Sequence, residues 1–350
     1  MGILGVLMSE LVKDGPDAAV VGKATAALYG VALGDAMGMP GELWSRQQIR
    51  EHFGEITGFL PGPPGHFIVD GYAAGQVTDD TQQTLMLAGA IIESGGRVEP
   101  AVIARHLVAW ADRVGASEGH FLGPNSARAI EALRAGAPLQ QIGVRSDTNG
   151  AAMRIAPVGI ISPPNDLVAL VDRVEAACAV SHRTTIAIAG ASMVAAALSV
   201  AFTARGLDEV FAAAYEAGSL GLLRGNPVPG ASLRRRTEWA LRRVAAGGTV
   251  EEVLEDLYDF LGAGVAMTET VPVALALVAL SGGDPIRASL LAANLGGDTD
   301  TIGAIAGGIC GAYAGMAGIP EDHRVVLDEV NAFDIPAVAA ALAVFRQRNQ

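Results

Sequence analysis

The chain has 350 residues, of which 51% are hydrophobic, 5% are aromatic and 44 are glycine. Its formal net charge of −13 at pH 7 argues against binding to the phosphate backbone of nucleic acids, because that backbone attracts a basic protein face. The length allows one large domain or two modest ones.

Hydrophobic residues recur at helical spacing along most of the chain, without a run of alternating strand residues or a fixed-period repeat. The first predicted helix, 17–33, is expected to stop at the glycines and the proline of 34–42. Residues 54–75 are rich in glycine and proline and predict a long loop, a feature that is often functional. Further helices are predicted at 45–52, 79–93, 98–113, 125–135 (capped by Asn125), 166–180, 183–204, 207–217, 232–246, 249–261, 268–279, 285–295, 301–317, 320–330 and 335–347. These patterns predict an all-α single domain with too many helices for a simple bundle.

Two apolar stretches, 186–204 and 301–320, are long enough to span a bilayer. Both are rich in small residues and lack basic flanks and interfacial aromatic residues at both ends, so we expect a soluble core and no membrane partner. The N-terminal sequence lacks the basic segment of a secretory signal peptide. Cys178 and Cys310 lie in apolar helical patterns outside any Cys-x-x-Cys pair, which favours buried, reduced thiols in a cytoplasmic protein.

Two short motifs, more than two hundred residues apart, each gather oxygen-bearing side chains at a predicted helix start. The two triples are Thr78, Asp79 and Asp80, and Asp298, Asp300 and Thr301. Acids that cap a helix explain one or two of these carboxylates but not two triples. Four carboxylates brought together without a cation repel one another, and an all-oxygen ligand set suits Mg²⁺, Mn²⁺ or Ca²⁺ better than Zn²⁺. The ligands suffice for a pair of ions.

Other interpretations of the motifs fit less well. The Asp298 motif differs from the aspartyl-phosphate motif of phosphatases because two glycines, not an apolar strand, precede it. The spaced glycines of 303–311 follow no strand, so close helix packing explains them better than dinucleotide binding. Ser181 and His182 suggest a nucleophile pair, but neighbours on a helix point apart, so a hydrogen-bonded or substrate-facing histidine is expected. The arginines of 234–243 are interpreted as a solvated helix face.

Three motifs together resemble the ADP-ribosylglycohydrolase family. They are Thr-Asp-Asp-Thr at 78–81, Gly-Gly-Asp-Thr-Asp-Thr at 296–301, and Gly-Asp-Ala-Met-Gly-Met-Pro at 34–40 followed by Glu42. The resemblance extends from about residue 26 to 318. It implies a single all-α domain over 1–350 with its core at about 20–318, and a pair of Mg²⁺ or Mn²⁺ ions at the base of a cleft.

The resemblance also assigns roles to residues. The two oxygen triples match the metal ligands of the family, and Glu42 matches a glutamate that guards or contacts the site. Counterparts of the substrate-binding residues are Gly123, Asn125, Asn149, Gly150, Ala151, Met153 and His182. Where the dinitrogenase-reductase type has an acid, this chain has Leu122, which weakens the case for the same protein-linked substrate.

The predicted function follows from this site. Cleavage at ribose C1 passes through an oxocarbenium-like state, so the enzyme must fix the sugar and deliver a water molecule. Asp79 or Asp298 is the expected general base, with Glu42 beside the reaction. We therefore expect a metal-dependent hydrolase that releases ADP-ribose from an N- or O-linked acceptor on a protein or small molecule. The alternatives are a hydrolase of small ribosides or nucleosides and a non-catalytic binding or structural protein; the complete ligand set favours an enzyme.

Overall fold

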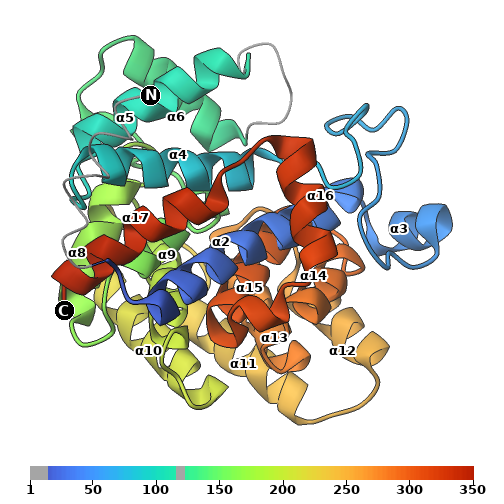
Figure 1. The fold of residues 1–350 in the computed structure, drawn as a ribbon. Helices are drawn as coiled ribbons and strands as arrows, with labels where there is room; N and C mark the ends of the chain where they lie inside the picture. The colour runs from blue at the N-terminus through green and yellow to red at the C-terminus, as the bar shows by residue number, and fades with distance from the viewer. Residues whose placement is uncertain (1–14, 116–122) are drawn as a thin grey trace.

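The structure is a computed structural model that describes residues 15–115 and 123–350. These residues form sixteen α-helices and no β-strand; extended backbone pairs only at three isolated bridges. The predicted all-α fold is therefore confirmed (Figure 1).

Helices α2 (Ala18–Gly38) and α15 (Thr299–Ala314) lie side by side in the middle of the molecule (Figure 1). A Cβ atom placed on Gly34 would overlap the carbonyl group of Gly303, and one placed on Gly38 would overlap the backbone at Thr299. The glycines thus allow the two backbones to approach each other closely. The predicted helix end at residue 33 is wrong, because these glycines serve a helix contact and α2 continues to Gly38.

The other helices surround this pair. They are α3 (Arg46–Phe53), α4 (Asp79–Glu93), α5 (Pro100–Arg113), α6 (Pro124–Arg134), α7 (Ala156–Ile161), α8 (Leu167–Cys178), α9 (Thr185–Ala201), α10 (Leu207–Gly221), α11 (Leu233–Ala245), α12 (Val250–Asp256), α13 (Met267–Ser281), α14 (Pro285–Ala293), α16 (Glu321–Asn331) and α17 (Ile335–Arg348). Helices α14 and α17 pack on α2, while α9 and α13 pack on α15. Helices α4, α5 and α6 form one end of the molecule and α10 to α13 the other (Figure 1).

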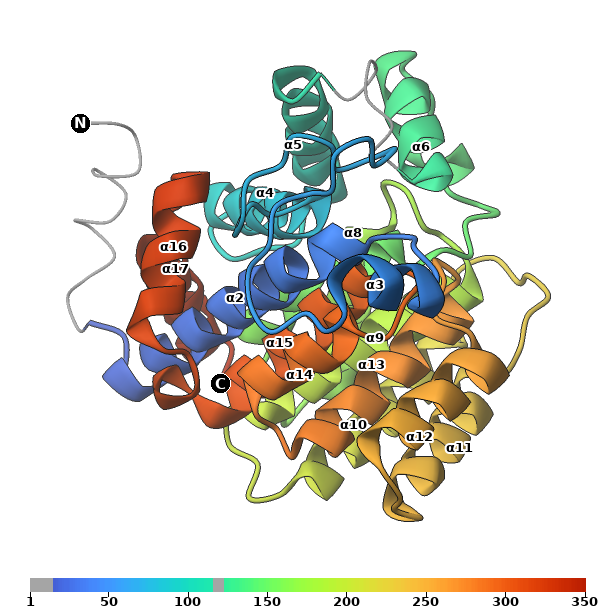
Figure 2. The same cartoon turned by 90° about the vertical axis from the view of Figure 1, so that its right-hand side faces the viewer.

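The predicted helices agree with these bounds to within a few residues, and 79–93 matches α4 at both ends. The predicted cap of α6 is wrong. Gly123 occupies the cap position, Pro124 begins the helix, and Asn125 lies inside its first turn, because proline favours the first helical position. The predicted long loop is present between α3 and α4, and Figure 2 shows it crossing the face of the molecule beside both helices.

The two apolar stretches lie in α9 and α15, whose side chains are almost all buried against other helices. Within the described ranges, no helix combines the length and the hydropathy needed to cross a membrane. Cys178 and Cys310 are free and buried, as predicted.

Candidate active site

The starts of α4 and α15 face one cavity of about 270 Å³, which we call the acidic cavity. It is lined by Glu42, Leu43, Phe67, Ile68, Asp79, Asp80, Gly123, Ser126, Thr148, Asn149, Gly150, Met153, Val265, Asp298, Asp300 and Thr301. The structure thus brings together most of the residues predicted from sequence, from segments more than 250 residues apart. Four predicted residues do not line the cavity: Thr78, Asn125, Ala151 and His182.

Asp35 of α2 holds the first motif in place, and it was not among the predicted site residues. Its Oδ1 accepts a hydrogen bond from the backbone N of Thr78 at 2.9 Å. Its Oδ2 accepts bonds from the backbone N and the hydroxyl of Thr81, at 3.0 and 2.6 Å. Thr78 caps α4 by accepting a bond from the backbone N of Asp80 at 3.3 Å. The buried Asp35 carboxylate therefore fixes where α4 begins and where its first acids point.

The second motif is held by its glycines. Gly296 and Gly297 have φ values of +88° and +81°, a region that glycine adopts without a steric penalty. Gly297 exchanges hydrogen bonds with the segment before α3: its O accepts from Leu43 N and its N donates to Trp44 O, both at 2.7 Å. The backbone N of Asp298 then donates to Ala263 O at 2.6 Å. This anchoring places Asp298 and the acids that follow it at the cavity.

Burial and mutual repulsion disfavour the charged forms of these acids. Burial raises the pKa of Asp35 to about 6 and that of Asp298 to about 6. Burial, followed by the charge of Asp35, raises the pKa of Asp79 to about 7. The pKa values of Glu42, Asp80 and Asp300 lie well above their usual range, chiefly through burial and then through neighbouring carboxylates.

Among the described residues, three carboxylate oxygens at this site are buried without a hydrogen-bond partner: Glu42 Oε2, Asp80 Oδ2 and Asp300 Oδ1. No lysine or arginine lines the cavity in the described part of the chain. Buried acceptors of this kind call for a cation or a donor, and oxygen donors suit a hard divalent ion. As they stand, no three Asp, Glu, His or Cys side chains within 15–115 and 123–350 are grouped around one point as ion ligands are. The donor chemistry fits a divalent ion, while the predicted ligand set stays a prediction.

A buried hydrogen-bond network leads from the first motif into the interior. Asp79 Oδ2 accepts from Gln83 Nε2 at 2.6 Å, and Gln83 Oε1 accepts from Arg154 Nη1 at 2.6 Å. The other end of the Arg154 guanidinium donates to Ser181 Oγ. Burial lowers the pKa of Arg154, and the Asp79 charge partly opposes that shift. Arg154 therefore supports Asp79 indirectly, through Gln83.

The network continues to the substrate loops. Ser181 Oγ lies 2.8 Å from His182 Nδ1, and His182 Nε2 lies 3.1 Å from Thr148 Oγ1, which also accepts from Asn125 Nδ2 at 3.0 Å. The argument that Ser181 and His182 point apart is wrong, because both lie in the turn after α8 and not on a helix. Both are fully buried, and burial lowers the pKa of His182 to about 3. His182 is thus a neutral group that supports Thr148 and Gly150 from behind.

Asn149 joins the substrate loops to the second motif. Its Nδ2 donates to a carboxylate oxygen of Asp298 and to Thr270 Oγ1, the latter at 2.9 Å. Ser126 and Thr148 also line the cavity, and neither was among the predicted site residues, although both lie beside residues that were. Leu122, the predicted departure from the family pattern, lies outside the described residues.

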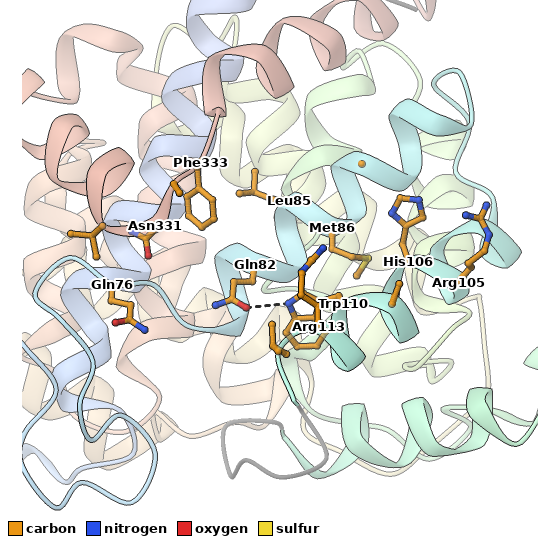
Figure 3. Close-up of a pocket in the computed structure, with 15 residues that line it drawn as sticks. Gln76, Gln82, Leu85, Met86, Arg105, His106, Trp110, Arg113, Asn331 and Phe333 are labelled. Carbon is orange, nitrogen blue, oxygen red and sulfur yellow. Dashed lines mark hydrogen bonds between the residues drawn. The ribbon is translucent and has the colours of Figure 1, made fainter. Parts of the chain in front are cut away.

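A larger cavity of about 870 Å³ lies on another side of α4, against α5 and the end of α16. Figure 3 shows its lining, with Met86 beside the indole of Trp110, which donates to Gln82 Oε1 at 3.1 Å, and Phe333 beside Asn331. None of the motif residues reaches it. The volume of a cavity therefore does not identify the active site in this protein. The clustered carboxylates mark the acidic cavity as the candidate active site.

Comparison with known proteins identifies the family of the chain. The sequence profile of the family described as ADP-ribosylglycohydrolase matches residues 16–350. The chain belongs to the ADP-ribosylglycohydrolase family. This membership confirms the resemblance found in the motifs and supports, at the level of the family, a hydrolase that acts on ADP-ribosyl linkages.

Individual relatives cover most of the chain. It is 41% identical to the uncharacterized protein YegU of Escherichia coli K12, over 93% of this chain and 97% of that protein. It is 29% identical to the ADP-ribosylarginine hydrolase Tri1 of Pseudomonas putida GB-1, over 86% of this chain and 72% of that protein. A solved structure described as an ADP-ribosylglycohydrolase-related protein complex matches with a TM-score of 0.67 and 25% identity, covering 95% of this chain and 99% of the other.

Proposed function

We propose that the protein is a metal-dependent hydrolase that cleaves the C1 glycosidic bond of ADP-ribosylated substrates, with an N- or O-linked acceptor. The observation that carries the proposal is the set of carboxylates around the acidic cavity, three of which have a buried oxygen without a partner. An acidic floor of this kind suits a divalent ion and a sugar whose anomeric carbon becomes positively charged in the transition state.

The residues divide into two roles. Those proposed to hold two Mg²⁺ or Mn²⁺ ions are Thr78, Asp79, Asp80, Asp298, Asp300 and Thr301. A divalent ion supplies Lewis-acid chemistry at oxygen atoms next to it. Asp79 and Asp298 are the candidate general bases, because each carboxylate lines the acidic cavity and is held by one amide donor, from Gln83 and Asn149 respectively. Gln83 orients the first of them and Asn149 the second.

Product analysis tests this proposal. The protein is incubated with Mg²⁺ or Mn²⁺ and either ADP-ribosylated peptides or small ribosides, and the products are identified by mass spectrometry. Release of ADP-ribose supports the proposal. Because the relative Tri1 is an ADP-ribosylarginine hydrolase, an ADP-ribosylarginine peptide is the first substrate to test. Release of ribose or ribose phosphate from the small set alone would replace the proposal with a riboside hydrolase.

A double variant tests the proposed metal ligands and the candidate general base together. The double variant Asp79→Asn, Asp300→Asn is expected to lose Mn²⁺ binding in calorimetry and about 10²–10⁴-fold in turnover, because it removes two donors and a candidate base. Asp172→Asn is the control, since this exposed carboxylate pairs with Arg224 and does not line the cavity. If the double variant bound Mn²⁺ and turned over substrate like Asp172→Asn, the proposed site would be wrong.

A further inference from the structure

The mouth of the acidic cavity is apolar although its floor is acidic. Leu43, Phe67 and Val265 line it and are 40%, 59% and 39% exposed, which makes them three of the ten large apolar side chains that are exposed in the described structure. Scattered exposed apolar residues are common, but a group around one cavity marks a binding surface. The ribose and a divalent ion do not account for this apolar rim, because both bind through oxygen atoms. The parts of an ADP-ribosylated substrate that could contact the rim are therefore the adenine and the acceptor.

Phe67 is held in a fixed position. Its ring stacks on His66 with centroids 5.0 Å apart and planes inclined by 13°. His66 is buried, and its Nδ1 accepts bonds from the backbone N atoms of Ile68 and Val69 at 3.1 and 3.2 Å. Because Nδ1 accepts both bonds, Nε2 carries the proton in this network and donates to Glu42 O at 3.0 Å. The exposed ring therefore needs little ordering when a ligand binds.

The rim is joined to the residues proposed for catalysis. The bond from His66 ties Phe67 to Glu42, and Leu43 donates its backbone N to Gly297, next to Asp298. Leu43 has φ of +54°, an uncommon conformation for a leucine, which directs its side chain to the cavity mouth. Phe67 is thus fastened to the Glu42 side of the cavity, whereas Gly123 and Asn149 belong to other segments of its wall.

We propose that Phe67 is a specificity-determining residue that stacks on a planar heteroaromatic ring in the acceptor of the substrate, with Leu43 and Val265 contacting the ring edge. This inference rests on the proposed function and narrows its acceptor class. A flat ring gains stacking and apolar contact at this rim. A guanidinium also stacks on aromatic rings and would find acceptors in the carboxylates of the cavity floor, so an alkylguanidine is the competing ligand in the test below.

Calorimetric binding to the full-length protein with Mg²⁺ tests the inference without turnover. The probes are adenosine and methyl riboside, which share the ribose and differ in the ring. Adenosine is expected to bind about 10- to 100-fold more tightly to the native protein. Phe67→Ala should abolish this difference, and Phe67→Trp should restore it. Phe260→Ala is the matched control, because Phe260 is 71% exposed and contacts Trp239 away from the cavity.

Equal affinities of the two probes for the native protein, or equal weakening of both by Phe67→Ala, would overturn the inference. So would a ring-free alkylguanidine that binds more tightly than adenosine and loses that affinity in Phe67→Ala. ADP-ribose separates the acceptor from the nucleotide end, since its reactive ribose carries a hydroxyl in place of an acceptor at C1. Unchanged ADP-ribose affinity in Phe67→Ala supports an acceptor contact, and a loss equal to that of adenosine contradicts it. Because these are binding experiments, their failure is distinct from an absence of product in the hydrolysis assay.

Discussion

Asp35 shows how one buried side chain organises the site. It accepts three hydrogen bonds from Thr78 and Thr81, so the first turn of α4 depends on a carboxylate that faces α4 from α2. Its charge also raises the pKa values of Asp79 and Asp80, and so contributes to the unfavourable electrostatics of the cavity. The hydrogen bonds outweigh this repulsion, because a buried donor left without an acceptor loses the full free energy of its hydration.

Replacing Asp35 with Asn tests that balance. Asn offers one acceptor oxygen in place of two and turns an NH₂ group toward backbone N–H donors, so we expect the free energy of unfolding to fall by about 1–3 kcal/mol. Chemical denaturation at pH 7.5 measures the change. Asp17→Asn on the same helix is the control, because Asp17 is an exposed N-cap and Asn caps equally well. Equal stability of the two variants would contradict a structural role for Asp35.

Arg154 is a second residue whose effect on the site is indirect. Arg154→Met leaves Gln83 Oε1 and Ser181 Oγ buried without their donor, which should lower the free energy of unfolding by about 2–4 kcal/mol. Arg154→Lys keeps the charge but offers a single donor group in place of the fork, so an intermediate loss is expected. Arg234→Met, on the exposed face of α11, should change stability by less than about 0.5 kcal/mol. Thermal unfolding ranks the three variants by stability. A loss of stability for Arg154→Met no larger than that for Arg234→Met would exclude the hydrogen-bond network as a source of stability.

At the scale of elements, the α2–α15 contact positions both acidic motifs. Asp35 lies on α2 one turn from Gly38, whose carbonyl accepts a bond from the Thr299 hydroxyl at 2.7 Å. Thr299 is the first residue of α15 and stands between Asp298 and Asp300. Close approach of the two helices therefore sets the separation of the two motifs, and glycine makes that approach possible.

Glycine substitutions on α2 and α15 test this role. Gly303→Ala forces a methyl group into the backbone of α2 at Gly34, so we expect a loss of about 1–3 kcal/mol or more, together with loss of Mn²⁺ binding. Gly22→Ala on α2 is the matched control. No atom lies within 4 Å of its added Cβ, and alanine in a helix is worth about 0.5–1 kcal/mol, so stability should rise. Denaturant unfolding of both variants measures whether the free energy of unfolding falls or rises. An increase for Gly303→Ala would refute the close contact.

The same glycines explain where sequence reasoning failed. Glycine and proline at 34–42 are ordinary helix-stop signals, and only the position of α15 reveals that Gly34 and Gly38 are contact residues inside α2. Local signals succeeded where the cause is local: the capping box at Thr249 and the acids at the start of α4 both mark true helix starts. Most helices were therefore predictable, although the short helix α7 was missed, whereas the contacts between helices were not predictable.

At the scale of the molecule, the candidate site is assembled from segments that are far apart in the sequence. Glu42, Asp79 and Asp298 converge on one cavity, and the motifs allowed that convergence to be predicted because paired carboxylates need a shared cation. Asp35, Gln83 and Arg154 escaped prediction, since a side chain that positions another by a hydrogen bond has no distinctive spacing in sequence. Phe67 escaped for a different reason: its exposure and its stacking on His66 depend on the path of an irregular loop.

The clustered acids predict an unusual dependence of stability on pH. Their folded pKa values lie above the values near 4 of an unfolded chain, about 7 for Asp79 and well above the usual range for Asp80 and Asp300. The folded state therefore binds more protons, and its stability is full at low pH and falls as pH rises through the folded pKa values. His182 has the opposite effect on stability below pH 6.5, because folding lowers its pKa and the unfolded state then binds the extra proton. Melting temperatures are therefore compared from pH 6.5 upward.

We expect the protein in EDTA to have a lower melting temperature at pH 8.5 than at pH 6.5. Mn²⁺ should raise the melting temperature at both pH values and more at pH 8.5, because deprotonated carboxylates bind the ion and binding to the folded state alone stabilises it. Scanning calorimetry with and without Mn²⁺ measures both effects, with NaCl at equal ionic strength as the control for screening. Asp80→Asn should reduce the fall with pH and the response to Mn²⁺ together, since one carboxylate serves both. A melting temperature in EDTA that rises from pH 6.5 to 8.5 would show that deprotonation of these acids does not destabilise the folded state.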